Sequence, residues 1–322
     1  MTIYLTHHSA MEYWLGPYVV RADKTRRLSA LPSTPLPTGC VDAERLAFMG
    51  IKSTPIHTTV YAAAHRSRQT SVTSHLHTGA FPAGSFEHLR GEYWVASPEL
   101  CFCQMANELP FAEEVRLGYE LCARFRRNDF TDDLDEREPL TGESALLRFL
   151  DRCQGMPGHR TATRAARYVS EHAESPMEIA VAMLLTLSRH RGGYGLPHAV
   201  LNREITVTGR TDRSHQKTYR VDMAWPEKRL IVEYDSDLHH RAKPNVIADA
   251  KRRNDLQDAG WRVAALTWDQ VRSPQLMDEA AAQLARALGV RLPKSSLEQD
   301  FRRQELRATV LDWAVRAQGM PR

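Results

Sequence analysis

The sequence lacks the features that mark a secreted, membrane-spanning or disulfide-stabilised protein. Its five cysteines are an odd number and form no CxxC pair, which argues against a disulfide framework and against a zinc ribbon. No apolar run approaches the roughly 20 residues that a bilayer span requires. The N-terminus has no basic segment followed by an apolar stretch, so no secretory signal is expected. We therefore expect a cytoplasmic protein without a membrane partner.

Composition and length indicate an ordinary globular chain with two domains. Of the 322 residues, 42% are hydrophobic and 25% are charged, which excludes disordered and fibrous classes, and the length fits about two domains. An acidic stretch at 129–138 is a candidate linker, and we place the domains at 1–150 and 151–322. Residues 1–150 carry 15 Lys/Arg and 18 Asp/Glu, whereas 151–322 carry 28 and 21. The basic half suits a polyanion such as DNA, and the acidic half could face a protein partner.

The first half predicts a mixed α/β domain with weak periodicity. Helices are expected at 6–15 with Thr6 as N-cap, at 97–109 with Ser97 as N-cap, and at 113–124. Stretches rich in β-branched and aromatic residues predict strands at 56–64 and 92–96.

The second half is more regular and predicts an α-β-β-β-α-β-α order. The expected helices lie at 175–189, 246–259 and 275–288, and the expected strands at 204–208, 219–225, 230–234 and 262–267. A final amphipathic helix is expected at about 296–317. Ser175 and Glu178 have the spacing of a capping box at the start of the first of these helices.

A candidate catalytic cluster follows from the register of one predicted hairpin. If the polar residues 226–229 form its loop, Trp225 pairs with Leu230 and Asp222 lies opposite Glu233. Opposed side chains lie ~4.5–5.5 Å apart at Cβ, and a period of two adds Asp235 to the same face. The other face would then carry apolar residues suited to a core, namely Val221, Met223, Val232 and Tyr234.

Opposed carboxylates repel each other, so a hard cation such as Mg²⁺ or Mn²⁺ would relieve the conflict. Such an ion can polarise a phosphoryl oxygen and activate water. Downstream, Asp237, His239 and His240 are candidates for proton transfer. The alternative is a solvated sheet face whose carboxylates pair with basic neighbours such as Arg220 or Lys228.

These residues carry a resemblance to a known superfamily. Asp222, Glu233 within Ile-Val-Glu-Tyr-Asp-Ser-Asp-Leu-His-His, and Asp249-Ala-Lys-Arg-Arg-Asn-Asp-Leu resemble the PD-(D/E)XK nucleases. The pattern is most similar to the branch related to very-short-patch-repair (Vsr-like) endonucleases, and the likeness spans about 160–290. It implies a restriction-endonuclease-like α-β-β-β-α-β core in a mixed α/β (α+β) chain that has an additional N-terminal domain.

The resemblance also implies roles for particular residues. Asp222 and Glu233 would hold the metal, and Glu178 would match the glutamate of the first core helix, although the capping box also explains a Glu there. Asp235 stands where the superfamily has a lysine, and Ser236 replaces the glycine of the branch pattern. The proton-transfer group is therefore open, with His240 favoured over His239.

Basic residues near the cluster are candidate phosphate contacts. Arg164 and Arg167 would share one face of a helix with Arg160, and Lys251, Arg252 and Arg253 follow the acidic residues. The first group could equally face water. The alternative for the second group is a solvated helical face neutralised by Asp255 and Asp258.

The first half more weakly resembles AbiEi-like antitoxin or regulator proteins, through His7-His8-Ser9-Ala10 and Val95-Ala-Ser-Pro-Glu-Leu followed by Met105-Ala106. A zinc site pairing His75 and His77 with Cys101 and Cys103 is conceivable, but strand alternation or core packing explains these residues better.

These observations lead to an expected Mg²⁺- or Mn²⁺-dependent DNA endonuclease or nickase that hydrolyses phosphodiesters, in DNA repair or phage defence. The competing hypothesis is a DNA-binding transcriptional regulator or antitoxin-like protein that keeps a nuclease fold without catalysis.

Overall fold

The computed structural model describes residues 2–17, 19, 27–28, 41–128, 131, 133–208, 216–235 and 246–318. The chain divides into two compact units, Met1–Val169 (unit 1) and Ser170–Arg322 (unit 2). The division falls later than the predicted boundary at 150/151. The reason is that α5 (Glu143–Leu150) and α6 (His159–Ala166) pack on each other and on earlier helices of unit 1.

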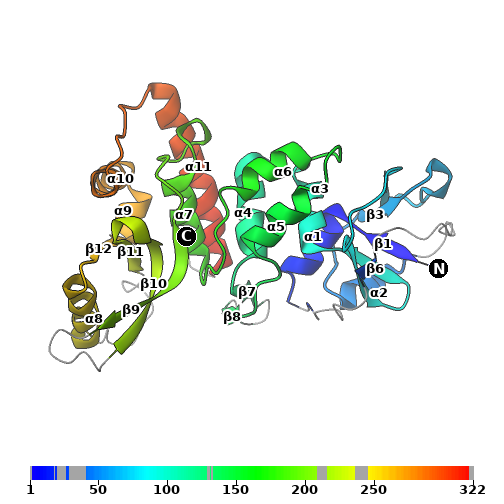
Figure 1. Ribbon diagram of the computed structural model, residues 1–322. Helices are drawn as coiled ribbons and strands as arrows, with labels where there is room; N and C mark the ends of the chain where they lie inside the picture. Colours follow the sequence, from blue (N-terminus) through cyan, green and yellow to red (C-terminus); the bar gives the residue numbers. More distant parts are fainter. Residues whose placement is uncertain are drawn as a thin grey trace. The chain divides into compact units, whose positions relative to one another are not determined.

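Among the described residues of unit 1, six strands form a mixed sheet in the order β2-β5-β6-β1-β3-β4 (Figure 1). Their bounds are β1 (Ile3–Leu5), β2 (Arg27–Leu28), β3 (Ile56–Val60), β4 (Val72–Leu76), β5 (Phe86–Arg90) and β6 (Tyr93–Ala96). Strand β1 runs parallel to β6 and antiparallel to β3, and β3 runs parallel to β4. The expected strands at 56–64 and 92–96 correspond to β3 and β6.

The helices in the described part of unit 1 are α1 (His7–Leu15), α2 (Ala43–Phe48), η1 (Ala63–His65), α3 (Pro98–Met105), α4 (Phe111–Leu121), α5 and α6. Helices α1, α3, α4, α5 and α6 pack on one another. The Ser97 hydroxyl accepts from the Leu100 amide as predicted for an N-cap. Thr6 is the N-cap residue of α1, as predicted, but its side chain makes no capping hydrogen bond.

The acidic stretch 129–138 is not a linker in its described part. Strand β8 (Leu134–Glu136) pairs antiparallel with β7 (Phe125–Arg127), and Arg126 forms an ion pair with Asp135 at 3.3 Å. Acidic side chains of this segment therefore form contacts within unit 1, where the basic strand β7 pairs with the acidic strand β8.

Unit 2 begins with an apolar helix, α7 (Pro176–Thr186). Ser175 caps it and Pro176 occupies its first position, where a missing N–H costs nothing. Almost all of its residues are buried, as expected for a helix that is hydrophobic on every side. The helix α11 (Leu297–Ala317) packs along it.

The sheet of unit 2 has the order β12-β11-β10-β9. Its strands are β9 (Val200–Thr208), β10 (Gln216–Trp225), β11 (Leu230–Asp235) and β12 (Arg262–Thr267). Strands β9, β10 and β11 are antiparallel neighbours, whereas β11 and β12 run parallel. The connection from β11 to β12 contains α8 (Val246–Asp258), and parallel neighbours require a crossover of this kind.

The remaining elements of unit 2 are η2 (Arg189–Arg191), η3 (Pro226–Lys228), α9 (Trp268–Arg272) and α10 (Pro274–Leu288). The sequence-predicted α-β-β-β-α-β order is therefore the observed order α7-β9-β10-β11-α8-β12. The chain is a mixed α/β protein, as expected. Within the described residues, no helix combines the length and apolar character that crossing a bilayer requires.

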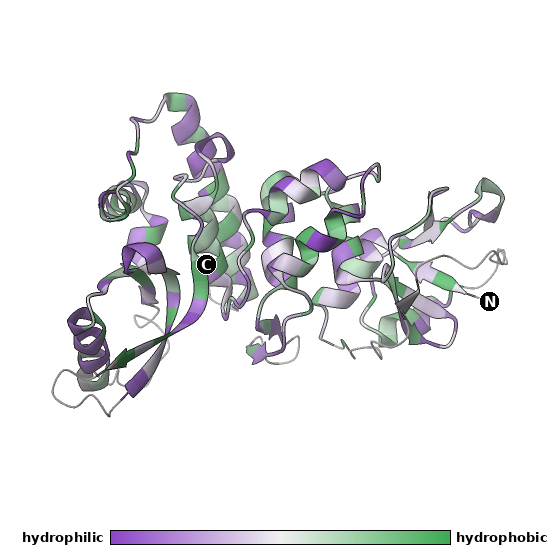
Figure 2. Ribbon diagram, in the orientation of Figure 1, coloured by the Kyte–Doolittle hydropathy of each residue, from purple (hydrophilic) through white to green (hydrophobic). Residues whose placement is uncertain are grey.

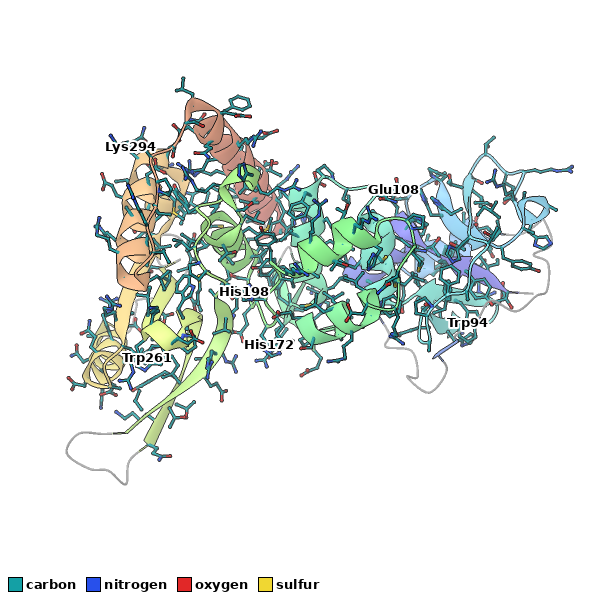
Figure 3. The ribbon with its side chains drawn as sticks, turned by 45° about the horizontal axis from the view of Figure 1, so that its top comes forward. Trp94, Glu108, His172, His198, Trp261 and Lys294 are labelled. Carbon is teal, nitrogen blue, oxygen red and sulfur yellow. The ribbon has the colours of Figure 1, made fainter. Side chains whose placement is uncertain are left out.

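One hydrophobic cluster of unit 2 lies between α8 and the sheet. Ile205, Val207, Val221, Ala224 and Ile231 pack with Leu256 of α8, and Trp261 packs at the edge of this cluster, beside α8 in Figure 3. The outward side of α8 is strongly hydrophilic (Figure 2). Helix α8 thus covers the sheet with one apolar side and presents charge on the other.

Candidate active site

The register of the β10–β11 hairpin is the predicted one. Trp225 pairs with Leu230, Ala224 with Ile231 and Met223 with Val232, and η3 forms the connection over residues 226–228. The next pair in this register is Asp222 and Glu233. The Tyr234 amide donates to Oδ2 of Asp222 at 2.8 Å, so this carboxylate reaches β11 beside Glu233, and its charge raises the pKa of Glu233. The two acids are therefore neighbours, as predicted.

The backbone beside Asp222 is irregular. Pairs between β9 and β10 run on both sides of Asn202 and Asp222, and Asn202 has a left-handed φ of 45°. Val221 and Ala224 both pack against the α8 side, although strict alternation would place them on opposite faces. The alternation therefore changes at Asp222 although the β9–β10 register is the same on both sides of it, so no residue is inserted there.

Glu178 is held at the start of α7 by several donors. The Ser175 hydroxyl (2.8 Å) and the Glu174 amide (2.9 Å) donate to its carboxylate, and Nδ2 of Asn202 donates to Oε2 at 2.5 Å. Asn202 also donates to the carbonyl of His172 at 2.9 Å. His172 is labelled in Figure 3. Glu178 therefore caps its helix and also belongs to the acidic cluster, so the two explanations for it are compatible.

We define the acidic cluster as Glu178, Asp222 and Glu233. Burial raises the pKa of Glu178 to about 7, and the charge of Asp222 adds to the shift. Burial and the neighbouring Asp222 raise the pKa of Glu233 to about 8. Burial raises the pKa of Asp222. The amide of Tyr234, which donates to Oδ2 of Asp222 at 2.8 Å, opposes this rise. The three acids thus disfavour simultaneous ionisation, the condition that a cation relieves.

One cation of the protein already contacts the cluster. Arg252 of α8 donates from Nη2 to Oε1 of Glu233 at 2.7 Å and to the carbonyl of Arg220. Sequence reasoning expected Arg252 at the phosphates, whereas here it neutralises Glu233. The alternative expectation, that Arg220 or Lys228 would pair with the cluster, is not observed for Arg220, which pairs with Glu174 at 2.5 Å.

The other predicted site residues are dispersed. Asp235 is exposed at the end of β11, and His240 and His239 lie outside the described residues. Lys251 and Arg253 are exposed on α8. Arg164 and Arg167 are exposed on α6 and just after it, in unit 1 rather than in the unit that contains the acidic cluster.

The sequence predicts that Asp255 neutralises the basic side chains of its own helix, α8. In the structure Asp255 also contacts β10, where it accepts from Lys217 at 2.7 Å and from the hydroxyl of Tyr219 at 2.5 Å. Sequence reasoning missed this contact and missed Asn202. In the observed β9–β10 register Asn202 lies opposite Asp222. That register depends on the length of the loop between the two strands, which could not be read from the sequence.

Comparisons with known proteins give limited information. No protein-family model matches the chain, and no solved structure matches it. The chain is 30% identical over 135 residues to two uncharacterized proteins of Mycobacterium tuberculosis, from strains CDC 1551 / Oshkosh and ATCC 25618 / H37Rv. The match covers 42% of this chain and 45% of each relative, so the chain spans less than half the length of these relatives.

Proposed function

We propose that unit 2 is a divalent-metal-dependent nuclease domain that hydrolyses DNA phosphodiesters, with a restriction-endonuclease-like core. The observation that carries this proposal is the neighbouring pair of acids Asp222 and Glu233 in adjacent strands, with Glu178 close enough for the charge of Asp222 to raise its pKa. The observed α-β-β-β-α-β order supports it, because the resemblance to PD-(D/E)XK nucleases implies that order.

The acidic cluster fits a hard divalent ion in its donor chemistry. Carboxylate oxygens are the ligands that Mg²⁺ and Mn²⁺ prefer, and Asp222 and Glu233 present carboxylates from adjacent strands. We assign them as metal ligands, with Glu178 on the same side. When bound, the ion would polarise the scissile phosphate and lower the pKa of a water molecule.

The protein groups have separate tasks in this proposal. Asn202 and Ser175 orient the Glu178 carboxylate. Glu178, with a pKa of about 7, can accept a proton near neutral pH. Arg252 would be released from Glu233 if a cation replaced its charge, and it would then be available, with Lys251 and Arg253 of the same helix, to contact the DNA backbone. Such contacts position a duplex without reading its sequence.

A second candidate function is supported by the same Arg252. Because its guanidinium already neutralises Glu233, the cluster can be stable without a metal ion. Unit 2 would then serve as a DNA-binding regulator that uses the fold as a platform.

The test is cleavage of supercoiled plasmid and of single-stranded DNA by the full chain with Mg²⁺, Mn²⁺ or EDTA. The variants are Asp222→Asn and Glu233→Gln, which keep the size of each side chain. Glu204→Gln is the matched control, since Glu204 is an exposed acid on β9. Metal-dependent nicking that both cluster variants lose and the control keeps supports the nuclease.

The two candidates differ in their binding behaviour. A regulator binds DNA in EDTA, prefers one sequence, and is indifferent to Asp222→Asn. Absence of cleavage on every DNA form, with folded protein and metal-independent binding, would reject the nuclease in favour of the regulator.

A further inference from the structure

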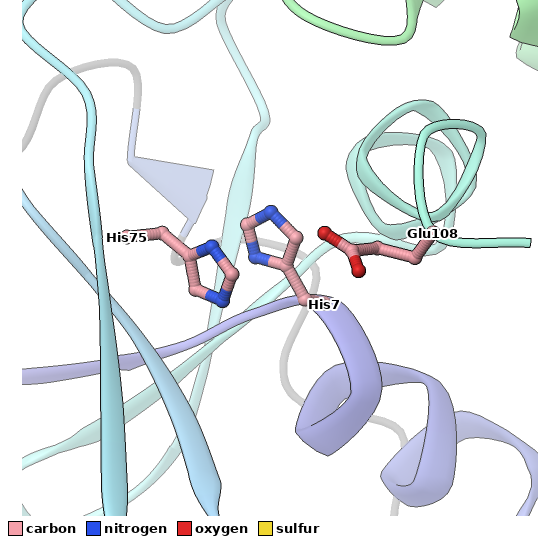
Figure 4. Close-up of side chains that lie close together, drawn as sticks. All are labelled: His7, His75 and Glu108. Carbon is pink, nitrogen blue, oxygen red and sulfur yellow. The ribbon is translucent and has the colours of Figure 1, made fainter.

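A second cluster of ionisable side chains lies in unit 1, where three separate segments meet. His7 begins α1, His75 lies on β4, and Glu108 follows the end of α3 (Figure 4). His57 on β3 adjoins them. Strands β3 and β4 are parallel neighbours, and Nδ1 of His57 lies 2.9 Å from Nε2 of His75. Residues far apart in the sequence are therefore gathered at one point by the sheet of unit 1.

The geometry of this group suits a metal ion. One ligand atom each of His7, His75 and Glu108 can be chosen so that all three lie within 4.8 Å of one another. Within the residues that the structure describes, this is the group of histidine, cysteine and acidic side chains that meets that limit. Neither Cys101 nor Cys103 belongs to it, and His77 lies against Phe81 instead, with ring centroids 4.0 Å apart.

Hydrogen bonds orient both imidazoles from outside the group. Nδ1 of His7 contacts the hydroxyl of Thr6 at 3.0 Å, and Nε2 of His75 contacts Nδ1 of His57 at 2.9 Å. These contacts leave Nε2 of His7 and Nδ1 of His75 to face a ligand. Metal-binding histidines are usually held in this way through their second nitrogen.

The backbone of His7 is also fixed. Its amide donates to Oε1 of Gln104 at 3.3 Å, and its φ is 49°, a left-handed value that residues with a Cβ rarely adopt. Such a conformation persists only where the surroundings impose it, and it occurs often at functional sites.

The imidazoles crowd one another. Burial, together with repulsion from the neighbouring His75 and His8, lowers the pKa of His7 to about 3 and that of His57 to about 4. Burial also lowers the pKa of His75, although the carboxylate of Glu108 opposes this shift.

We propose that unit 1 binds a divalent transition-metal ion of the Zn²⁺ class through His7, His75 and Glu108. Two imidazoles and one carboxylate favour such an ion over Mg²⁺, which prefers oxygen ligands. The rings of His7 and His75 stack at 3.5 Å with an angle of 11° between them. Because the rings are stacked, one of them would have to leave the stack, and the hydrogen bond that holds it, to share an ion with the other. Three protein ligands leave a coordination position for water or a substrate atom.

The experiment measures Zn²⁺ bound to the full chain after removal of metal with a chelator, by equilibrium dialysis and elemental analysis. The variants are His75→Ala and Glu108→Gln, and the matched controls are His190→Ala and Glu113→Gln. Glu108 and His190 are exposed, so neither change disturbs the core. Circular dichroism checks the fold of each variant, and the visible absorption of Co²⁺ reports the ligand geometry.

We expect one Zn²⁺ per chain in the wild type and both controls, and no competition by excess Mg²⁺. Zn²⁺ binding should be lost in His75→Ala. In Glu108→Gln it should be weakened by at least roughly 10–100-fold, the loss seen when an outer-shell partner is removed. Glu233→Gln, in unit 2, should keep its Zn²⁺, which separates this site from the acidic cluster. A wild type without bound Zn²⁺, or a folded Glu108→Gln variant that binds like the wild type, would overturn the proposal.

Discussion

Replacing Glu233 by Gln should stabilise the protein at alkaline pH and leave its stability almost unchanged at acidic pH. The pKa of Glu233 is raised from 4.5 to about 8 by burial and by Asp222. A raised carboxyl pKa means that the folded state prefers the protonated form. Its contribution to the free energy of unfolding is fully present below about pH 4.5 and is lost as the pH rises to about 8.

The size of the effect follows from the shift in pKa. A shift of about 3.5 units corresponds to about 5 kcal/mol as an upper limit. The side chain is 20% exposed and Arg252 lies 2.7 Å away, so solvent screening reduces the expected value to about 2 kcal/mol. Gln mimics the protonated acid, since it keeps Oε1 as acceptor for Arg252 and supplies a donor toward Asp222.

The assay is urea unfolding of wild type and Glu233→Gln at pH 5 and pH 9, compared within the same transition because the chain has two units. Glu204→Gln is the control for removal of one surface charge. At pH 9, Mg²⁺ should raise the stability of the wild type and not that of the variant. A difference between wild type and variant that is the same at both pH values would refute the electrostatic argument.

Three further substitutions test the packing and hydrogen bonds around the two units. Asn202→Gly should lower the free energy of unfolding by ~1–3 kcal/mol because it removes donors to Glu178 and His172. Asn202→Ala should lower it further because of the left-handed φ at this position. Equal stability of Asn202→Gly and wild type in urea would contradict this. Gly118→Ala should cost ~1–3 kcal/mol, since the new Cβ would lie 2.5 Å from Cγ2 of Val169, and a thermal melt without a shift would show that the site can relax. Tyr194→Phe should cost ~1–3 kcal/mol in the same measurement, because the hydroxyl that joins Asp278 to the buried Arg307 is lost.

The regular half of the fold could be predicted because its local signals agree. Ser175 and Pro176 fix the start of α7, and the bounds of β12 are those predicted, Arg262–Thr267. The hairpin register followed from one assumption about loop length, and it placed Asp222 beside Glu233. Local propensity, alternation and turn chemistry support the same answer here, which is the condition for a reliable prediction.

The rest depends on contacts that no local pattern contains. Strict alternation failed at Asp222 because the backbone of β9 turns to a left-handed φ at Asn202. Arg252 looked like a surface cation, and only the packing of α8 on the sheet directs it to Glu233. Likewise, His7 and Glu108 are about one hundred residues apart in sequence, so their meeting requires the fold of unit 1.

The packing of α11 along α7 makes the order of synthesis relevant to the acidic cluster. Glu178 lies in the first turn of α7, which is almost entirely buried and is covered in part by α11, whose buried residues include Leu306, Val310 and Leu311. The ribosome produces Glu178, Asp222 and Glu233 well before it produces α11. A nascent chain therefore carries all three acids while the helix that supports one of them is still uncovered, and unit 2 reaches its native packing only after residue 317 has been added.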